Sequence, residues 1–241
     1  VEGLEALYGV HVVPNLPAGS VGIRRGCLTA AAGELEIQIR GEGGHGARPH
    51  QAVDAVWMAA RVVTELQQSI ARRLDALQPV VVSFGKVEGG KAFNVIADQV
   101  RLLGTVRCLD LEQHDQLPGW IDETVQAICA SCGGSAEVNY RTIAPPVQND
   151  RSLTDLLERC AIQCLGRDQV HPVEQPSLGA EDFAELLRDV PGMMVRLGVA
   201  GPQGCAPLHN GQFALDERAL AVGINVLAST LLAWIADRRD R

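Results

Sequence analysis

This sequence of 241 residues has few aromatic side chains, no long apolar run and no excess of positive charge. No apolar run approaches the ~20 residues that cross a bilayer, and no basic segment followed by an apolar one opens the chain. The 29 acidic side chains outnumber the 21 basic ones, and the net charge of −8 repels a nucleic-acid backbone. Aromatic residues make up only 4% of the chain, too few for a surface that stacks bases. We therefore expect a soluble globular protein with neither a membrane nor a nucleic acid as partner.

Disulfide frameworks are also not indicated, because the seven cysteines are odd in number and widely scattered. This usage is typical of reduced thiols in the cytoplasm, where we expect the protein to be located. Cys129 and Cys132 form the only close pair of the metal or redox type, and no second pair accompanies them. The pair falls near the end of an apolar-periodic segment, so we interpret both cysteines as core residues.

The apolar periodicity predicts a compact unit over about residues 31–144. Its expected elements, in order, are a strand at 34–40, a helix at 53–70, strands at 80–87 and 100–108, a helix at 111–131 and a strand at 136–143. Strand, helix, strand, strand, helix, strand is the order of the ferredoxin-like sandwich, a four-stranded antiparallel sheet with two helices on one face.

The flanking segments, about 1–30 and 145–241, are expected to form a larger α/β layer into which this unit is inserted. Their expected elements are strands at 4–13 and 20–24, separated by Pro14 to Pro17, a helix at 151–165, a helix that opens at Glu181, a strand at 193–199 and a helix at 216–238. The first strand is a continuous apolar run of the kind that is buried on both faces.

Two histidines stand where an α/β sheet places ligands. His11 lies at the carboxyl end of the first predicted strand, and His209 lies in the loop after the strand at 193–199. If both strands belong to one sheet, the two imidazoles converge. Two histidines alone do not make a catalytic metal site, which needs at least three protein ligands. Glu181 and Asp182 are the available carboxylates, although acidic residues at a helix start are equally explained by the helix dipole.

Three further residues are candidates for binding. His45 is flanked by Gly43, Gly44 and Gly46, which permit unusual backbone conformations and a close approach to a ligand. Asn94 follows a glycine-rich turn, and Arg107 ends a strand, where its planar guanidinium suits a carboxylate. A solvated surface arginine is the alternative. From the residues alone, the sequence supports a binding crevice.

Six strings in this order and spacing carry a resemblance that covers nearly the whole chain. They are Leu7-Tyr8-Gly9-Val10-His11-Val12, Gly43-Gly44-His45-Gly46-Ala47-Arg48-Pro49-His50, Asn94-Val95-Ile96-Ala97-Asp98, Gly104-Thr105-Val106-Arg107, Gly179-Ala180-Glu181-Asp182-Phe183 and Leu208-His209-Asn210. Together they resemble the di-metal amidohydrolases of the aminoacylase and carboxypeptidase superfamily. The similarity is to the branch with hippurate hydrolase, N-acyl-amino-acid deacylases and auxin-conjugate hydrolases.

The resemblance implies a function and a role for each residue. The implied reaction is metal-dependent hydrolysis of the amide bond of N-acyl amino acids, with two divalent metal ions, zinc or manganese, in the complete enzyme. His11 and His209 would be metal ligands. His45 would be catalytic, reaching across a homodimer to polarise the scissile carbonyl and stabilise the oxyanion. Asn94 and Arg107 would bind the backbone or carboxylate of the substrate.

The implied fold class is α/β, with a ferredoxin-like α+β dimerisation domain inserted into an incomplete metallopeptidase-type α/β catalytic domain. Catalytic segments at 1–30 and 145–241 would flank the dimerisation and lid domain at 31–144. The family's His-x-Cys-Gly-His-Asp and Glu-Glu motifs are not present, and the chain begins at Val1 directly before a predicted strand. We therefore expect the C-terminal part of such an enzyme, which by itself hydrolyses little. The alternative is a non-catalytic dimerisation or small-molecule-binding protein built on the ferredoxin-like unit.

Overall fold

The computed structural model describes residues 3–75, 77 and 79–239, which form two compact units. Unit 1 contains the chain up to Thr29, the segment Val147–Ser177 and the chain from Asp182 onward. Unit 2 contains Ala30–Pro146 and Leu178–Glu181. Every site residue named above belongs to one unit or the other.

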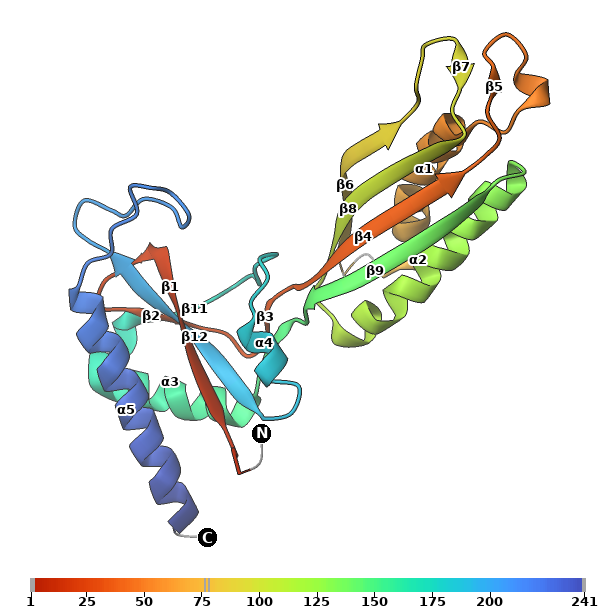
Figure 1. The fold of residues 1–241 in the computed structure, drawn as a ribbon. Coiled ribbons are helices and arrows are strands. Elements are labelled where there is room, and N and C mark those ends of the chain that lie inside the picture. Colours follow the sequence, from red (N-terminus) through yellow and green to blue (C-terminus); the bar gives the residue numbers. More distant parts are fainter. Residues whose placement is uncertain (1–2, 76, 78, 240–241) are drawn as a thin grey trace. The chain divides into compact units, whose positions relative to one another are not determined.

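Unit 1 is a mixed four-stranded sheet of order β1-β12-β2-β11 with two long helices against one face (Figure 1). Its elements are β1 Leu7–Pro17, β2 Val21–Ile23, β3 Gly26–Thr29, β10 Val147–Asn149, α3 Arg151–Leu165, a 3-10 helix Arg167–Gln169, β11 Val170–Pro172, α4 Phe183–Leu186, β12 Gly192–Ala200 and α5 Arg218–Arg239. Strand β12 runs parallel to β1 and antiparallel to β2, while β3 and β10 pair separately. Alternate β12 residues such as Val195 and Leu197 pack against α3 and α5 in one buried cluster.

Strand β1 differs from the predicted strand in length and burial. It continues through Pro14 and Pro17 with a register irregularity after Val13, so the prolines do not separate two strands. His11 therefore lies in the middle of β1 and not at its carboxyl end. Because β1 is the edge strand of this sheet, most of its residues are partly exposed, and the prediction of burial on both faces was wrong. Edge strands accept proline because one row of N–H groups has no neighbouring strand.

Helix α5 corrects the prediction about apolar runs. By length and composition alone it could cross a membrane, a test that core helices of soluble proteins also pass. Its best 18-residue window has a mean hydropathy of 2.0, and 17% of that window is buried. Asn225, Ser229 and Thr230 interrupt the run without adding charge, which explains why a search for uninterrupted apolar residues overlooked it.

Unit 2 is an antiparallel sheet of order β6-β8-β4-β9 with α1 and α2 packed on one face (Figure 1). Its elements are β4 Ala31–Arg40, β5 Gly44–His45, a 3-10 helix Pro49–Gln51, α1 Ala55–Arg73, β6 Val80–Gly89, β7 Val95–Ile96, β8 Gln99–Cys108, α2 Leu111–Ser131 and β9 Ser135–Ala144. The long helices begin at aspartate caps: Asp54 accepts from two backbone N–H groups of α1, and Asp110 accepts from one of α2. The order of the six long elements is the one that the periodicity predicts.

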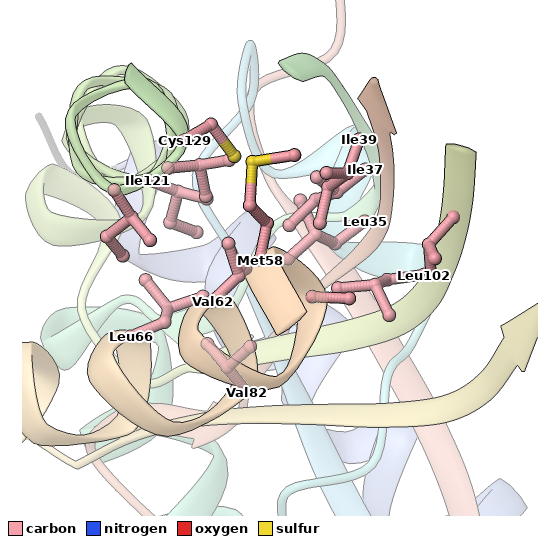
Figure 2. Close-up of a cluster of buried hydrophobic side chains, with 14 of the residues drawn as sticks. Leu35, Ile37, Ile39, Met58, Val62, Leu66, Val82, Leu102, Ile121 and Cys129 are labelled. Carbon is pink, nitrogen blue, oxygen red and sulfur yellow. The ribbon is translucent and has the colours of Figure 1, made fainter. Parts of the chain in front are cut away.

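The core of unit 2 lies between its sheet and its two helices. Figure 2 shows Ile37 and Leu102 of the sheet, Met58 of α1 and Ile121 of α2 meeting in this core, and all four are wholly buried. The two-stranded sheet of β5 and β7 lies beyond the end of β4, outside this core (Figure 1). The core thus holds the four-stranded sheet rigid while the small sheet projects from it.

Candidate functional site

The ring of His11 contacts the backbone of the next residue. Its Nδ1 lies 2.7 Å from the carbonyl oxygen of Val12. A carbonyl oxygen only accepts, so Nδ1 carries the hydrogen and the lone pair lies on Nε2. Metal-binding histidines are typically held this way, with one ring nitrogen donating to a backbone carbonyl while the other faces the metal. The donor chemistry of His11 therefore fits a divalent metal.

The backbone of His209 has an unusual conformation. Its φ of 65° makes it the one non-glycine residue with a positive φ in the part of the chain that the structure describes. It is exposed in the loop between β12 and α5, in a turn where the Asn210 N–H donates to the carbonyl of Pro207. A left-handed conformation costs a residue with a Cβ about 1–2 kcal/mol, and such strain is concentrated at functional sites.

The topology of unit 1 relates these two histidines. Because β1 and β12 run parallel, their carboxyl ends lie at the same edge of the sheet. The loop that carries His209 leaves from that edge, and His11 lies opposite Arg196 in the register. Among the described residues, no group of three or more His, Cys, Asp or Glu side chains could hold a metal ion. The structure therefore places His11 on β1 and His209 in the loop that follows the neighbouring strand β12.

The helix dipole of α4 does not account well for the acidic residue at the start of this helix. Asp182 occupies the N-cap position of α4, but its side chain makes no capping hydrogen bond. Helix α4 is only four residues long, so a helix dipole provides little reason for an acidic residue there.

His45 and Asn94 line one cavity of about 310 Å³ in unit 2. The Ala47 N–H donates to Nδ1 of His45 at 3.1 Å, so the hydrogen of the neutral ring lies on Nε2. His45 thus presents a donor, the opposite arrangement to that of His11. Lys91 and Asp98 also line the cavity, and Nζ of Lys91 lies 3.6 Å from Oδ2 of Asp98.

The glycines around His45 serve close packing and not an unusual backbone conformation. None of Gly43, Gly44 and Gly46 has a positive φ, so the expectation of a conformation barred to other residues is not met. A Cβ on Gly46 would lie 2.9 Å from the carbonyl oxygen of Asn94, which accepts from the Gly46 N–H. Glycine at this position lets the backbone of His45 lie against that of Asn94.

Arg107 lies at the other end of the sheet. The cavity adjoins the Gln99 end of β8, whereas Arg107 pairs with Ala32 near the start of β4. Since a strand rises about 3.4 Å per residue, Gln99 and Arg107 are on the order of 27 Å apart. The pairing of β5 with β7 therefore brings His45 close to Asn94, and the length of β8 separates both from Arg107.

Two polar residues near these sites were missed by the sequence reasoning. Arg196, opposite His11, is partly buried on β12, and burial lowers the pKa of its guanidinium. Its buried Nε has no hydrogen-bond partner among the described residues. Arg196 is the one charged residue in the apolar run 193–199, and that interruption was the available sequence signal for it. Lys91 lies in the glycine-rich turn shortly before Asn94, and this proximity was the available signal for the cavity.

The chain belongs to peptidase family M20/M25/M40, whose model matches residues 1–233. It is 50% identical over 236 residues to "Probable hydrolase sll0100" of Synechocystis sp., covering 97% of this chain and 60% of that protein. It is 34% identical over 228 residues to the N-acetylcysteine deacetylase of Bacillus subtilis, and the match covers 95% of this chain and 58% of that protein.

A solved structure agrees with this assignment. The YXEP protein of Bacillus subtilis, described as a dinuclear metal-binding peptidase of the M20 family, matches with a TM-score of 0.78 and 31% identity. The match covers 95% of this chain and 57% of that one. The chain thus spans between 57% and 60% of the length of these three relatives.

The strained backbone at His209 leads to a stability prediction. We expect His209→Gly to be more stable than His209→Ala by about 1–2 kcal/mol, because only glycine adopts a positive φ without a steric penalty. Urea unfolding of the two variants measures the difference. The same pair at Gln212, which has no positive φ, is the control, and there glycine should not be favoured. Equal stability of the two His209 variants would show that the loop carries no strain.

Proposed function

We propose that this protein is a metal-dependent amidohydrolase that cleaves the amide bond of N-acyl amino acids. The observation that carries the proposal is the opposite hydrogen bonding of two imidazoles, with the lone pair of His11 and the hydrogen of His45 both on Nε2. The Nε2 lone pair of His11 can bind a cation, and the Nε2 hydrogen of His45 can donate to a developing negative charge. The deacetylase named among the relatives supports the substrate class.

Each site residue has a role in this proposal. His11 and His209 would hold a divalent metal, zinc or manganese, and imidazole ligands suit zinc in particular. When bound, the metal would activate a water molecule and polarise the amide. His45 Nε2 donates to the carbonyl oxygen as negative charge develops there, and Asn94 orients the same group from the same cavity. Arg107 binds the free carboxylate of the amino acid through its planar guanidinium.

Two copies of the chain are needed for these roles to act on one substrate. The separation of His45 from Arg107, on the order of 27 Å along β8, exceeds the length of a small N-acyl amino acid. We therefore infer a homodimer in which His45 and Asn94 of one copy complete the site that contains Arg107 of the other. Phe93, next to Asn94, has a fully exposed side chain, as an aromatic residue covered by a second copy would.

The free edge of β6 is the surface we propose for the dimer contact. Beside β6 lies an apolar cavity of about 440 Å³, formed with α1 and lined mainly by Val56, Ala60 and Val63 of α1 and Val87 of β6. Val56 and Val87 are 51% and 61% exposed. An apolar edge strand is a template for pairing with another chain. On this interpretation unit 2 is a ferredoxin-like dimerisation domain inserted into the catalytic domain.

Two further expectations belong to the same proposal. All seven cysteines are free, which supports a reducing compartment such as the cytoplasm. The expectation that these 241 residues alone hydrolyse little stays a prediction, which an assay of the chain with added zinc and N-acetyl amino acids tests.

The dimer surface is tested by one charged substitution. We expect Val87→Asp to shift the protein from dimer to monomer in analytical ultracentrifugation, because it places two like charges on a closed apolar contact. The matched control is Ile143→Asp on β9, the other edge strand, where the side chain is 49% exposed. A Val87→Asp protein that remains dimeric would exclude this edge as the interface.

The two proposed histidine roles are separated by measuring metal content and turnover together in the full-length enzyme. We expect His45→Ala to keep its metal and lose about 10²–10³-fold in turnover, the effect of removing an oxyanion donor. His209→Ala should instead lower metal occupancy. His50→Ala, an exposed histidine on the neighbouring 3-10 helix, is the control and should change neither quantity. Unchanged turnover in His45→Ala, or full metal content in His209→Ala, would refute the respective role.

A further inference from the structure

The last turn of α2 brings Cys129 and Cys132 together. Cys129 lies in the helix and Cys132 is the residue that caps its end. The Cys132 N–H donates to the carbonyl of Cys129 at 3.0 Å, a bond between residues three apart. In such a tighter turn the side chains of these residues eclipse one another, and a rise of about 2.0 Å per residue puts the two Cα atoms about 6 Å apart. That separation is within the range of disulfides.

A fixed cation lies on the sulfur of Cys132. Nη1 of Arg61 donates to Cys132 Sγ at 2.8 Å and to Ser131 Oγ at 2.9 Å. Its Nε donates to Glu65 at 2.7 Å, and the guanidinium lies 5.5 Å from the ring centroid of Trp57. The arginine is thus held in place from several sides. The guanidinium therefore lies where it would contact any negative charge formed on the Cys132 sulfur during reaction.

The two cysteines have opposite environments. Cys132 is partly exposed, whereas Cys129 is wholly buried and, as Figure 2 shows, lies near Met58 in the core. Burial raises the pKa of Cys129 to about 11. Cys132 is therefore the thiol that an oxidant reaches first, and Cys129 is the resolving thiol that would react with the oxidised Cys132.

We propose that Cys132 and Cys129 form a reversible oxidation site that closes a disulfide when the protein meets a hydroperoxide. The Cys132 thiolate attacks the distal oxygen of the hydroperoxide, the O–O bond breaks, and the alkoxide or hydroxide released takes up a proton. The product is a sulfenic acid on Cys132. Cys129 then gives up its proton and its sulfur attacks that of Cys132. The S–O bond breaks, and hydroxide leaves and is protonated to water.

This site does not depend on the proposed hydrolytic function, because all its residues lie in unit 2 away from the His45 cavity. The redox change takes two electrons and two protons from the cysteine pair, and a dithiol compound restores them. The high pKa of Cys129 makes ring closure the step that should quicken as pH rises toward 11.

The sequence around the pair allows a direct measurement. Cleavage after Glu123 and Glu137 releases a peptide of residues 124–137 that contains Cys129 and Cys132 and no other cysteine. After treatment of the folded chain with hydrogen peroxide and alkylation in denaturant, we expect this peptide to be about 2 Da lighter than the reduced form and to resist alkylation. Dithiothreitol should restore two alkylation sites.

Variants assign the roles of the three side chains. Cys129→Ser should stop the oxidation at a sulfenic acid that a dimedone probe traps on Cys132, and Cys132→Ser should leave Cys129 reduced. Arg61→Met should slow the alkylation of Cys132 several-fold, because it removes the cation that contacts the Cys132 sulfur. Arg61→Lys should retain most of the rate. The control is Arg73→Met on the same helix, whose guanidinium lies over Trp120 and not at a cysteine.

Cys164 provides the internal standard, since it is more exposed than Cys132 and its Sγ donates to the neutral hydroxyl of Ser229 at 3.2 Å. The proposal requires native Cys132 to be alkylated faster than Cys164. It is overturned if Cys164 reacts first, if both thiols of the 124–137 peptide remain alkylatable after peroxide, or if Arg61→Met reacts as fast as the unchanged protein. Circular dichroism of each variant confirms that the fold is retained.

Discussion

The length of the sheet in unit 2 is the constraint on which the functional account depends. Strands β4 and β8 pair without a break from Ala31 to Arg40, so the two ends of the sheet stay apart. One end carries the His45 cavity and the other carries Arg107. The buried core beneath makes this separation rigid, because a sheet packed on two helices does not shorten. The proposed homodimer accounts for this separation, because His45 of one molecule and Arg107 of another could then contact one substrate.

The rings of two histidines each contact the adjacent backbone. Nδ1 of His11 lies 2.7 Å from the carbonyl oxygen of Val12, and the Ala47 N–H donates to Nδ1 of His45. Because a carbonyl oxygen accepts and an N–H donates, the two contacts favour opposite tautomers of the two rings. At His209 the backbone conformation itself is unusual. Contacts within a short segment thus orient each of these side chains, and the pairing of strands brings some of them together.

Local sequence signals predicted the helices well, because their ends are encoded by neighbouring residues. The helix at 151–165 begins after Asp150, whose carboxylate accepts from the Leu153 N–H, and ends at Gly166, whose φ is 87°. Features that depend on distant partners were not predictable in the same way. The course of β1 is one of them: its pairing with β12 continues past Pro14 to Pro17, which places His11 in the middle of the strand.

The candidate site shows the same limit. His45 and Asn94 are 49 positions apart in the sequence, and only the pairing of β5 with β7 brings them into one cavity. Arg107 was grouped with them because its string belongs to the same resemblance, and the strand register is what separates it. The resemblance therefore identified the residues, and the distance along β8 supports our proposal that they serve two copies. The family is established by the match over residues 1–233, and the roles of individual residues stay proposals.

The most direct test of the shared site is complementation between two inactive variants of the full-length enzyme. His45→Ala and Arg107→Ala subunits, each with a different affinity tag, are co-expressed, and the mixed dimer is isolated by two successive purifications. In that dimer one site contains the intact His45 and the intact Arg107 from different copies, so the account predicts about half of the unaltered activity per dimer. A mixed dimer as inactive as its two parents would contradict the account, because it would place both residues in a site formed by one chain.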